Sequence, residues 1–385
     1  MRVTPLVTGL TLAAALLPVG LPLTPASAST CAPPTNLLIT HKPSVRNLPG
    51  GAVMKTWDSG PMPDALKIQH VVEVRIPASS TLRARVITAG ALTRSATVGS
   101  YAAKIPSAVV TINGSVFDPA IGALPIKLVR VGSQPIKGDT TNQGVLAIGR
   151  DHKAFMEKVH LAGHVTAGGR TWPVTGLNWG SVIGSGINVY TTSWGTRTRP
   201  YGTVDVVVAN GKVVARRTGT ARGKAATSGQ SILTATGTAG TQLSALRVGA
   251  AVSMAYAQFS ESGAPVVDAV ARGYRYVFGS LSEGGDCSAH DEQIRPRTAV
   301  GWNAAGDTLI VTVSGRAVVN GVLWGGATHH QMPTYMRQLG AVGAVGLDGG
   351  GSTTMFVRNA SGATPYRVDR PGAPQRPVPN GIAWY

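Results

Sequence analysis

Residues 344–355 read AVGLDGGGSTTM, an apolar run that stops at one carboxylate, Asp348, and continues with Gly349, Gly350 and Gly351. Each glycine costs a regular element about 0.5–1 kcal/mol relative to alanine, so three in succession indicate a loop with a special backbone requirement. Glycine N–H groups can approach a ligand closely, and successive N–H groups form a nest that binds anions. We therefore predict a strand that ends in an anion-binding loop, with Asp348 as its acid, base or cation ligand.

Most of the chain around this loop has the pattern of short β-strands. Apolar and charged residues alternate over residues 70–76 and 82–87, which is typical of half-exposed strands. Further short apolar segments, separated by Gly, Asn, Asp and Pro, continue to residue 384. The pair Asn210-Gly211 is typical of a hairpin turn.

One helix is predicted directly before the strand that leads into the glycine loop. It covers residues 332–339, with Thr328 as the candidate N-cap and Gly340 as the C-cap. Residues 217–243 are rich in Gly, Ala and Thr and have little periodicity, so we expect a loop or a weak hairpin there. The fold class predicted is α+β, with β-rich mixed sheets, few helices, and active-site loops at strand ends.

The N-terminus has the pattern of a secretory signal peptide over residues 1–28. An apolar run at 6–17 precedes an A-x-A cleavage site that ends at Ala28. The alternatives are a membrane anchor, although prolines at 18 and 22 interrupt the apolar stretch, and a lipoprotein anchor on Cys31. No later segment has about 18 uncharged apolar residues, so no transmembrane segment is predicted. We expect a secreted, extracellular or cell-wall-associated protein, with an extended or β lead-in at 29–94 and one domain over 95–385.

The charge of the chain restricts its partners. The 385 residues have a formal net charge of +18, with 43% hydrophobic and 14% charged residues. Such basicity indicates an acidic partner, namely nucleic acid, an anionic lipid surface or a phosphate-bearing polymer. Aromatic residues make up only 5% of the chain and basic residues are dispersed, which argues against specific nucleic-acid binding.

The chain has two cysteines, Cys31 and Cys287. In an oxidising compartment a single disulfide between them is the plain expectation, and two free thiols are the alternative. Neither cysteine lies in a CxxC or metal-ligand pattern, so a redox or zinc role is not predicted.

Four polar clusters stand at predicted strand ends. They are NGSVFD at 113–118, RPRTAVG at 295–301, SGR at 314–316, and the glycine loop itself. In this order, together with RPVPNGI at 376–382, they resemble the phosphodiester glycosidase family, to which the uncovering enzyme that removes N-acetylglucosamine from a phosphodiester belongs. The resemblance spans roughly residues 95–385. Two positions depart from the family pattern: Ser314 stands where the family usually has Asp, and Gly346 where it commonly has Asn.

The resemblance implies two catalytic carboxylates. Asp348 is the first candidate, and its alternative role is to cap its own turn. Asp118 is the second candidate, and an ordinary Asp-Pro turn with Pro119 is the alternative. Retaining enzymes place two such groups about 5–5.5 Å apart and inverting enzymes about 6.5–9.5 Å apart.

The resemblance also implies a set of substrate- and phosphate-binding residues. An arginine guanidinium binds phosphate bidentately, although a surface position is the alternative for each arginine of so basic a chain. The hydroxyl and amide side chains can bind sugar or phosphate oxygens, or instead hold the turn and the strand ends. The set comprises Asn113, Gly114, Arg297, Thr298, Arg316, Gly349, Gly350, Gly351, Ser352, Thr353 and Asn380.

No metal site is predicted and no cofactor is firmly implied. His329 and His330 are adjacent and point different ways, without an HxxxH pattern, so we place them in the first turn of the helix. His290, near two aspartates, is ambiguous. The one ion that the pattern admits is Ca²⁺, held by carboxylates and carbonyls near Asp348. Trp172, Trp179 and Trp194 form either a sugar-stacking wall or part of the core.

These features favour a secreted hydrolase. It would cleave a sugar from a sugar-1-phosphodiester in an envelope glycopolymer or exopolysaccharide, and its partner would be an anionic, phosphate-containing glycan. The alternative is a non-catalytic cell-wall or exopolysaccharide-binding protein that keeps the same residues without the chemistry, a reading that Ser314 supports.

Overall fold

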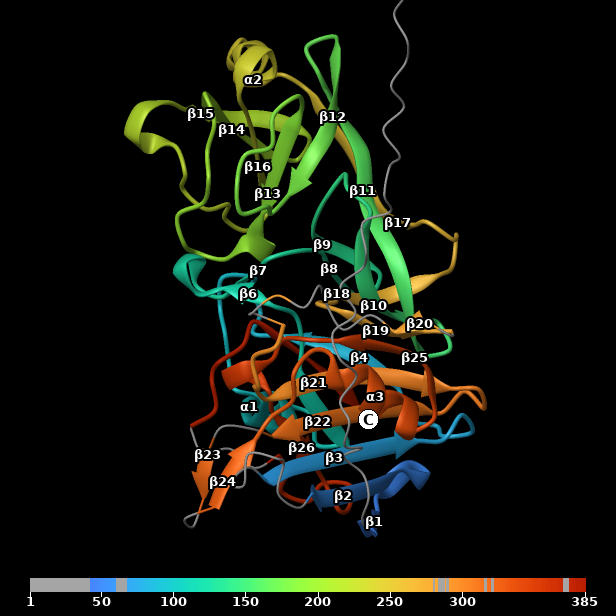
Figure 1. Ribbon diagram of the computed structural model, residues 1–385. Helices are drawn as coiled ribbons and strands as arrows, with labels where there is room; N and C mark the ends of the chain where they lie inside the picture. Colours follow the sequence, from blue (N-terminus) through green and yellow to red (C-terminus); the bar gives the residue numbers. More distant parts are fainter. Residues whose placement is uncertain are drawn as a thin grey trace, which may run out of the picture.

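The computed structural model describes residues 42–59, 68–279, 281–282, 288, 291–314, 317–319, 322–369 and 374–385. They form two lobes, one above the other in Figure 1. We call the lower one the sandwich lobe, which contains β1–β5 and β19–β28, and the upper one the extension lobe, which contains β8–β18. Within the described part of the chain, no helix is both long and apolar enough to cross a membrane.

A ten-stranded sheet is the centre of the sandwich lobe. Its main path runs in the order β1-β2-β3-β22-β21-β25-β19-β20, and the β23–β24 pair joins beside β3. Apart from the parallel contact of β24 with β3, its strand pairs are antiparallel. The strands are β1 (Ser44–Asn47), β2 (Val53–Ser59), β3 (Ile68–Ile76), β19 (Arg275–Phe278), β20 (Leu281–Ser282), β21 (Arg297–Asn303), β22 (Thr308–Ser314), β23 (Ala317–Val319), β24 (Val322–Gly325) and β25 (Ala341–Gly346).

A five-stranded sheet packs on one face of the ten-stranded sheet. Val74 and Val300 of the larger sheet belong to one apolar core with Ile112 and Ile382 of the smaller sheet. The order of the smaller sheet is β27-β26-β5-β28-β4. Its strands are β4 (Ala84–Thr88), β5 (Val110–Asn113), β26 (Met355–Val357), β27 (Tyr366–Arg367) and β28 (Asn380–Trp384).

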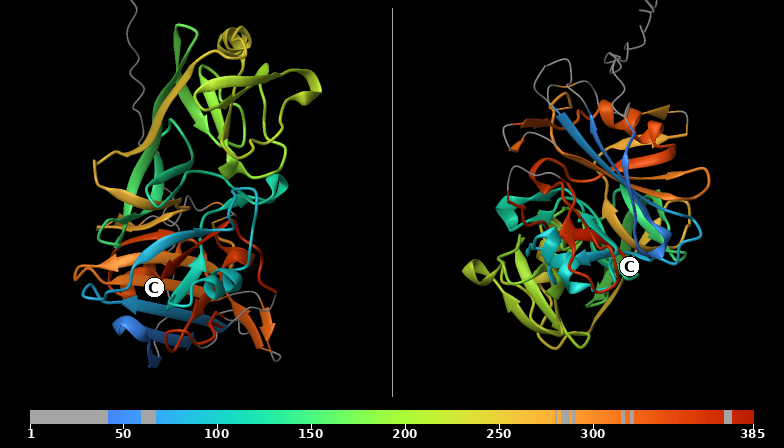
Figure 2. Two further views of the ribbon diagram at one scale, coloured as in Figure 1. Left: turned by 180° about the vertical axis from the view of Figure 1, so that it is seen from behind. Right: turned by 90° about the horizontal axis from the view of Figure 1, so that it is seen from below.

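Two helices cover the outer faces of this pair of sheets. On the ten-stranded sheet, Met332 and Met336 of α3 (Gln331–Gln338) pack with Val311 of β22. On the five-stranded sheet, Tyr101 of α1 (Val98–Lys104) packs with Phe356 of β26. Figure 2 shows the α1 side from behind. The order of layers in the sandwich lobe is therefore helix, small sheet, large sheet, helix.

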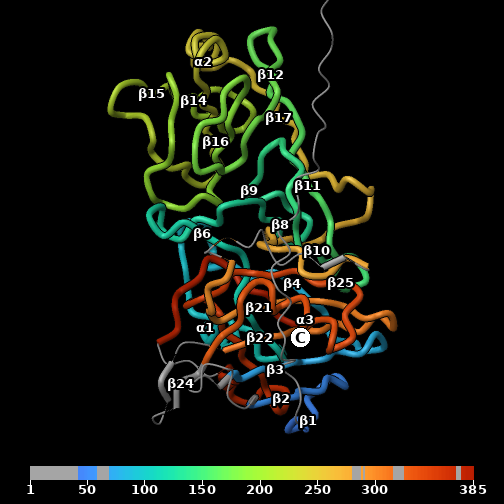
Figure 3. The backbone as a smooth tube through the Cα atoms, viewed as in Figure 1, coloured from blue at the N-terminus to red at the C-terminus, as the bar shows by residue number. Residues whose placement is uncertain are grey.

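The extension lobe is inserted between the strands of the sandwich lobe. The chain enters it after the short pair β6 (Phe117–Asp118) and β7 (Leu124–Pro125) and returns through β17 and β18 (Figure 3). Its eleven-stranded sheet has the order β15-β14-β16-β13-β12-β9-β8-β18-β10-β11-β17. Because β12 pairs with β11 as well as with β9, six of these strands close into a ring. The strands are β8 (Val129–Val131), β9 (Gln134–Asp139), β10 (Gln143–Gly149), β11 (Ala154–Ala167), β12 (Arg170–Leu177), β13 (Ile187–Thr191), β14 (Val204–Ala209), β15 (Lys212–Arg217), β16 (Gln230–Ala235), β17 (Val252–Ser260) and β18 (Val266–Ala271).

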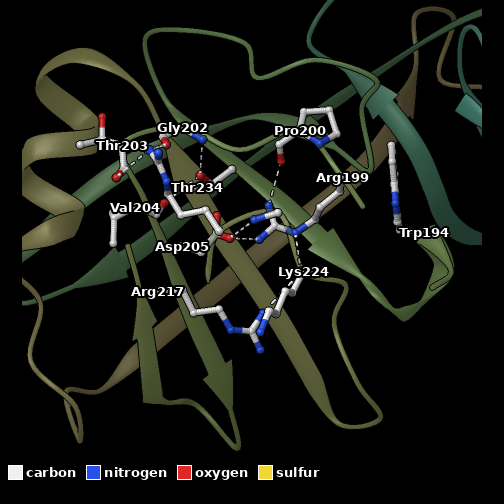
Figure 4. Close-up of polar contacts among 12 residues, drawn as sticks. Trp194, Arg199, Pro200, Gly202, Thr203, Val204, Asp205, Arg217, Lys224 and Thr234 are labelled. Carbon is white, nitrogen blue, oxygen red and sulfur yellow. Dashed lines mark hydrogen bonds and ion pairs between the residues drawn. The ribbon is translucent and has the colours of Figure 1, made fainter. Parts of the chain in front are cut away.

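A buried ion pair fixes one end of β14 in the extension lobe (Figure 4). Arg199 Nη2 lies 2.5 Å from Asp205 Oδ2, and both side chains are fully buried. Arg199 also donates from Nε to the Lys224 carbonyl at 3.1 Å and from Nη1 to the Pro200 carbonyl at 2.9 Å. The Gly223 N–H donates to Asp205 at 2.8 Å. The loop that contains Arg199 and Pro200 and the loop that contains Gly223 and Lys224 are thereby held against the sheet.

The structure confirms the main predictions about elements. The fold is β-rich with few helices and several sheets. The alternating segments are β3 and β4, and the predicted helix is α3. Asn210 and Gly211 have φ of 49° and 68° and join β14 to β15, as a hairpin turn requires.

The loop or weak hairpin predicted for residues 217–243 is wrong for residues 230–243. This stretch contains β16, which pairs with both β13 and β14, and most of α2 (Gly237–Ser244). Pairing on both sides stabilises β16 although its Gly- and Thr-rich surroundings show no strand pattern. In the region expected as a lead-in at 29–94, β3 lies between β2 and β22 inside the large sheet.

Candidate functional site

Four strand ends from both sheets of the sandwich lobe meet at the glycine loop. Asn113 ends β5, Arg297 begins β21, Gly346 ends β25 and Asn380 begins β28. The Asp348 N–H donates to the Gly114 carbonyl at 3.0 Å, and the Leu347 N–H donates to the Thr298 carbonyl at 2.9 Å. These bonds tie the strand that leads to Asp348 to the small sheet and to its neighbour in the large sheet.

The Asn113 side chain is the centre of this junction. Its Nδ2 donates to the Asp348 carbonyl at 2.7 Å. Its Oδ1 accepts from Thr298 Oγ1 at 2.8 Å and from the Thr354 N–H at 3.2 Å. Asn113 and Thr298 are buried, so their polar groups hold both ends of the glycine loop in place.

Asn380 holds the turn that follows β5. Its Oδ1 accepts from the Ser115 N–H at 2.9 Å, and its Nδ2 donates to Ser115 Oγ at 2.8 Å. A Cβ at Gly114 would lie 2.0 Å from Asn380 Oδ1, which explains why glycine stands there. Asn380 is therefore placed to hold a strand end, one of the two roles expected for it.

The glycine loop is a short 3-10 turn, Gly350–Ser352, in which Gly350 has φ of 60°. The Gly349 N–H donates to Asp348 Oδ1 at 3.0 Å, and the Gly350 N–H donates to the Pro296 carbonyl at 2.8 Å. The predicted anion nest is therefore not open at these two positions. At Gly351 the nearest group is the Arg376 guanidinium, whose Nη2 would lie 2.8 Å from a Cβ there.

Asp348 has an unusual electrostatic environment. Burial raises the pKa of its carboxyl group from 3.8 to about 6. The Ser352 hydroxyl, the Gly349 N–H and the positive charge of Arg376 act against this by favouring the carboxylate. The exposed Arg376 guanidinium thus lies close to both the carboxyl group and the loop.

Three hydroxyl groups directly after the loop are buried without a hydrogen-bond partner of normal geometry. They belong to Ser352, Thr353 and Thr354, which are at most 3% exposed. The Ser352 hydroxyl is near enough to Asp348 to lower its pKa, but the two groups do not meet hydrogen-bond geometry. Buried polar groups almost always have partners, so three adjacent exceptions beside a carboxyl group mark this turn as a candidate functional site.

Arg297 lies beneath the loop. Its Cδ and Nη1 are 3.7 Å from the position that a Cβ at Gly349 would take. The buried guanidinium donates from Nε to the Ala327 carbonyl at 2.9 Å and from Nη2 to the Gln293 carbonyl at 2.7 Å. Nη1 donates to His329 Nε2 at 2.6 Å. Because each of its nitrogens already has a protein acceptor, Arg297 is placed to support the loop with its charge.

The contact with Arg297 determines which ring nitrogen of His329 carries the proton. Since a guanidinium only donates, His329 Nε2 must accept, and the ring proton is then on Nδ1. From there it donates to the Tyr276 hydroxyl, 2.8 Å away. His329 is thus a neutral, buried link between Arg297 and Tyr276.

Tyr276 gives a physical reason for Gly346, one of the two departures from the family pattern. A Cβ at this position would lie 2.7–2.8 Å from the ring and hydroxyl of Tyr276, which is fully buried. The tyrosine therefore occupies the space that a side chain at position 346 would need.

Asp118 lies apart from these contacts. Its Oδ1 accepts from the Ala120 N–H at 2.9 Å and caps the 3-10 turn Pro119–Ile121. This is the local Asp-Pro turn that was the alternative to a catalytic role.

The tryptophans do not form one wall. Trp172 and Trp194 are buried in two different apolar clusters. Trp179 is partly exposed, and Lys137 Nζ lies 3.4 Å from its ring centroid. A stacking wall of all three side chains is therefore wrong.

The remaining predicted residues are placed as follows. Ser314 is buried at the end of β22 opposite His70. His330 Nε2 lies 3.2 Å from Glu292. Because α3 begins at Gln331, His329 and His330 stand just before its first turn, and their predicted place within that turn is wrong. In the described part of the chain, no three His, Cys, Asp or Glu side chains are grouped to hold a metal ion. Arg316, His290 and both cysteines, with their predicted disulfide, lie outside the described residues.

Sequence reasoning missed Arg376 and Tyr276. Arg376 begins the RPVPNGI segment, so its position beside a recognised motif was a usable indication. Tyr276 lies in an ordinary apolar strand, β19, which gives no such indication.

Comparisons with known proteins show which family this chain is similar to. The model of the phosphodiester glycosidase family matches residues 202–385, just under half of the chain. The resemblance predicted from the motifs is thereby confirmed. The match contains three of the four strand ends, those at Arg297, Gly346 and Asn380, and begins after Asn113. No curated protein matches the chain.

Among solved structures, a hypothetical protein from Synechocystis has a TM-score of 0.69 and 23% identity, covering 89% of this chain and 64% of that one. This chain thus spans less than two thirds of its length. A Burkholderia pseudomallei protein named "putative exported protein" has a TM-score of 0.64 and 19% identity, over 82% and 74%. These two structures share the fold. The zebrafish N-acetylglucosamine-1-phosphodiester alpha-N-acetylglucosaminidase catalytic domain, auto-inhibited by its pro-peptide, has a TM-score of 0.45 and 12% identity, over 89% and 88%.

Proposed function

We propose that this protein is a hydrolase that cleaves the bond between a sugar and the phosphate of a sugar-1-phosphodiester. The observation that carries the proposal is the Asp348 carboxyl group, whose pKa is raised to about 6, beside the Ser352 hydroxyl that favours its carboxylate and the buried hydroxyls of Thr353 and Thr354, which have no hydrogen-bond partner. The match to phosphodiester glycosidases supports it. A perturbed carboxyl group among unpartnered polar groups is characteristic of a functional site.

The proposed reaction adds water to the anomeric carbon, breaks the bond between that carbon and the phosphate oxygen, and releases a free sugar and a phosphomonoester. With a pKa of about 6, Asp348 can accept a proton from water, attack the anomeric carbon, or donate a proton to the leaving oxygen near neutral pH. The phosphate leaving group is a weak base and needs little protonation. One carboxyl group can therefore suffice.

The residues around Asp348 would bind the phosphate and stabilise its charge. Arg376, exposed at Gly351, is placed to pair with the phosphate, and the hydroxyls of Ser352 and Thr353 can donate to its oxygens. Arg297 adds positive charge from beneath Gly349. Positive charge and donors fixed in advance stabilise the charge that develops in the transition state.

The test is release of free sugar from UDP-N-acetylglucosamine and from a chromogenic sugar-1-phosphodiester. We expect turnover by the native chain and a loss of about 10²–10⁴-fold in kcat for Asp348→Asn, the usual contribution of acid–base catalysis. Arg376→Gln should raise KM, whereas Arg247→Gln, at an exposed arginine of the extension lobe, is the charge-matched control. Normal turnover by Asp348→Asn would overturn the assignment.

Two further parts of the proposal need separate tests. Asp118→Asn decides whether a second carboxylate takes part, because its side chain caps a turn that Asn also caps. Treatment with EDTA, followed by added Ca²⁺, decides whether a calcium ion near Asp348 is required.

The proposed substrate is an anionic glycopolymer or exopolysaccharide outside the cell. The net charge of +18 favours attraction to such a polymer, and the signal-like pattern at residues 1–28 favours export. Detection of the mature chain in the medium or cell wall, beginning near Ser29, tests this part.

A second candidate function is binding of the same glycan without hydrolysis. Ser314, buried at the end of β22 where the family usually has a carboxylate, favours it. Saturable binding of the phosphodiester without sugar release would establish this alternative.

A further inference from the structure

A cavity lies at the opposite end of β21 from the candidate site, where the two lobes meet. It has a volume of about 540 Å³, within the range of small-molecule sites. The turn between β10 and β11 forms one side, and the turn between β21 and β22 forms the other. Trp302 is five residues from Arg297 along β21, which corresponds to about 17 Å. The cavity is therefore separate from the loop at Asp348.

Two aromatic side chains, Trp302 and Phe155, line this cavity and are both partly exposed. The Trp302 indole lies across β25, since a Cβ at Gly343 would be 2.3 Å from its ring atoms. The backbone of β25 thus holds the indole in a fixed position. A fixed aromatic face with an exposed part is a suitable platform for the apolar face of a sugar ring.

The rim of the cavity is positively charged. Arg150 and Lys153 line it and are exposed, and neither forms an ion pair within the described residues. Lys153 Nζ lies 3.8 Å from the position of a Cβ at Gly306, on the facing turn. The one carboxylate of the lining, Asp151, accepts from the Lys153 N–H at 3.2 Å and keeps further acceptor capacity for a hydroxyl group.

We infer that this cavity is a second binding site for an acidic sugar unit, with Trp302 and Phe155 against the ring and with Arg150 and Lys153 pairing its carboxylate or phosphate. The choice of a glycan as ligand rests on the proposed function, whereas the binding does not require hydrolysis at Asp348. A polymer held here and at the glycine loop would contact both ends of β21.

The experiment is calorimetric titration with trigalacturonate, with maltotriose as the neutral probe and AMP as the nucleotide probe, at about 0.15 M salt. We expect saturable binding of trigalacturonate and much weaker binding of maltotriose and AMP. Arg150→Gln/Lys153→Gln should weaken trigalacturonate binding by about tenfold or more, because it removes both charge-assisted contacts. Hydrolysis of a small chromogenic substrate should be unchanged in this variant.

The matched control is Lys212→Gln/Arg247→Gln, which removes the same charge from exposed positions in the extension lobe. An equal loss of affinity in this control would show attraction by net charge alone and overturn the inference. So would the absence of saturable trigalacturonate binding, or tighter binding of AMP. Asp348→Asn should retain the binding, so a failure of hydrolysis and a failure of this site give different results.

Discussion

The carboxyl group of Asp348 is partly buried beside Gly349 and Ser352, and burial raises its pKa from 3.8 to about 6. A group whose pKa is higher in the folded state binds protons more tightly there than in the unfolded chain. Its contribution to stability is complete below pH 3.8 and is lost as the pH rises through about 6. The native protein therefore carries an unfavourable carboxylate at neutral pH.

We predict that Asp348→Asn is more stable than the native chain at pH 8, by about 1–3 kcal/mol, while it loses activity. At pH 4 the two proteins should differ little, which makes the low-pH measurement an internal control. Urea unfolding at both pH values gives the two differences. A variant that is less stable at pH 8 than at pH 4, relative to the native chain, contradicts the electrostatic account.

Replacement of Gly346 by a larger residue should destabilise the fold through a steric clash. A Cβ would meet the ring of the buried Tyr276 at 2.7–2.8 Å, and neither group can move freely. Gly346→Ala should cost about 1–3 kcal/mol, as overpacking of a core does. Thermal or urea unfolding measures this. Gly184→Ala is the control, since a Cβ there meets nothing within 4 Å, and a comparable loss in it would refute the steric explanation.

For single residues, the sequence predicts those that belong to a local motif. It does not predict those that strand pairing brings to the site from distant parts of the chain. Asp348 and its glycines could be chosen because their local pattern is unusual. Tyr276 reaches Gly346 only because β19 pairs with β25, a contact that no local pattern records. The use of Arg297 as an internal support was likewise unpredictable, because it depends on acceptors at Gln293, Ala327 and His329.

Among the elements, α3 positions His329 directly before its first turn. The N-cap position of α3 is His330, two residues after the predicted Thr328. Thr328 and Gln331 nevertheless form a reciprocal cap: the Gln331 N–H donates to Thr328 Oγ1 at 3.1 Å, and the Thr328 N–H donates to Gln331 Oε1 at 2.9 Å. We predict that Thr328→Ala destabilises the protein by about 1 kcal/mol. Thr328→Ser keeps the hydroxyl and should stay near the native value in urea unfolding; an equal loss in both variants would exclude the cap as the cause.

The same element shows what could be read from the sequence. A capping residue, an apolar spacing of helical period and a terminal glycine predict α3 together, and Gly340 indeed has φ of 89°. By contrast, α2 contains two glycines and two threonines and lacks a side-chain hydrogen bond at its N-cap. Its packing on β14 and β16 through Leu243 supports it, and this contact is not visible locally.

For the whole molecule, strand pairing determines which distant motifs meet, and the sequence does not predict that pairing. Short apolar segments predict many strands but not the order in which they pair. The extension lobe, residues 129–271, separates Asn113 from Arg297 in the chain, yet these residues lie at one junction. The sequence could therefore identify the four polar clusters but could not show which of them lie together in the structure.

The extension lobe also allows a test of how far the two lobes depend on each other. Arg199→Met leaves Asp205 as a buried charge without its partner, which typically costs about 3–5 kcal/mol. Arg199→Met/Asp205→Leu removes both charges and should recover most of this loss. The apolar core that contains Val300 and Ile112 continues into the extension lobe at Val270, but it is a separate cluster from the one around β13–β16 that contains Val206 and Leu233.

We therefore expect the effect of Arg199→Met to be confined to the extension lobe. In hydrogen exchange followed by mass spectrometry, amides of β13–β16 should exchange faster, whereas those of β21, β22 and β25 should keep their native protection. Hydrolysis at Asp348 should also persist in this variant. Equal loss of protection in both lobes would mean that they unfold as one cooperative unit, and the glycine loop would then depend on the buried ion pair of the other lobe.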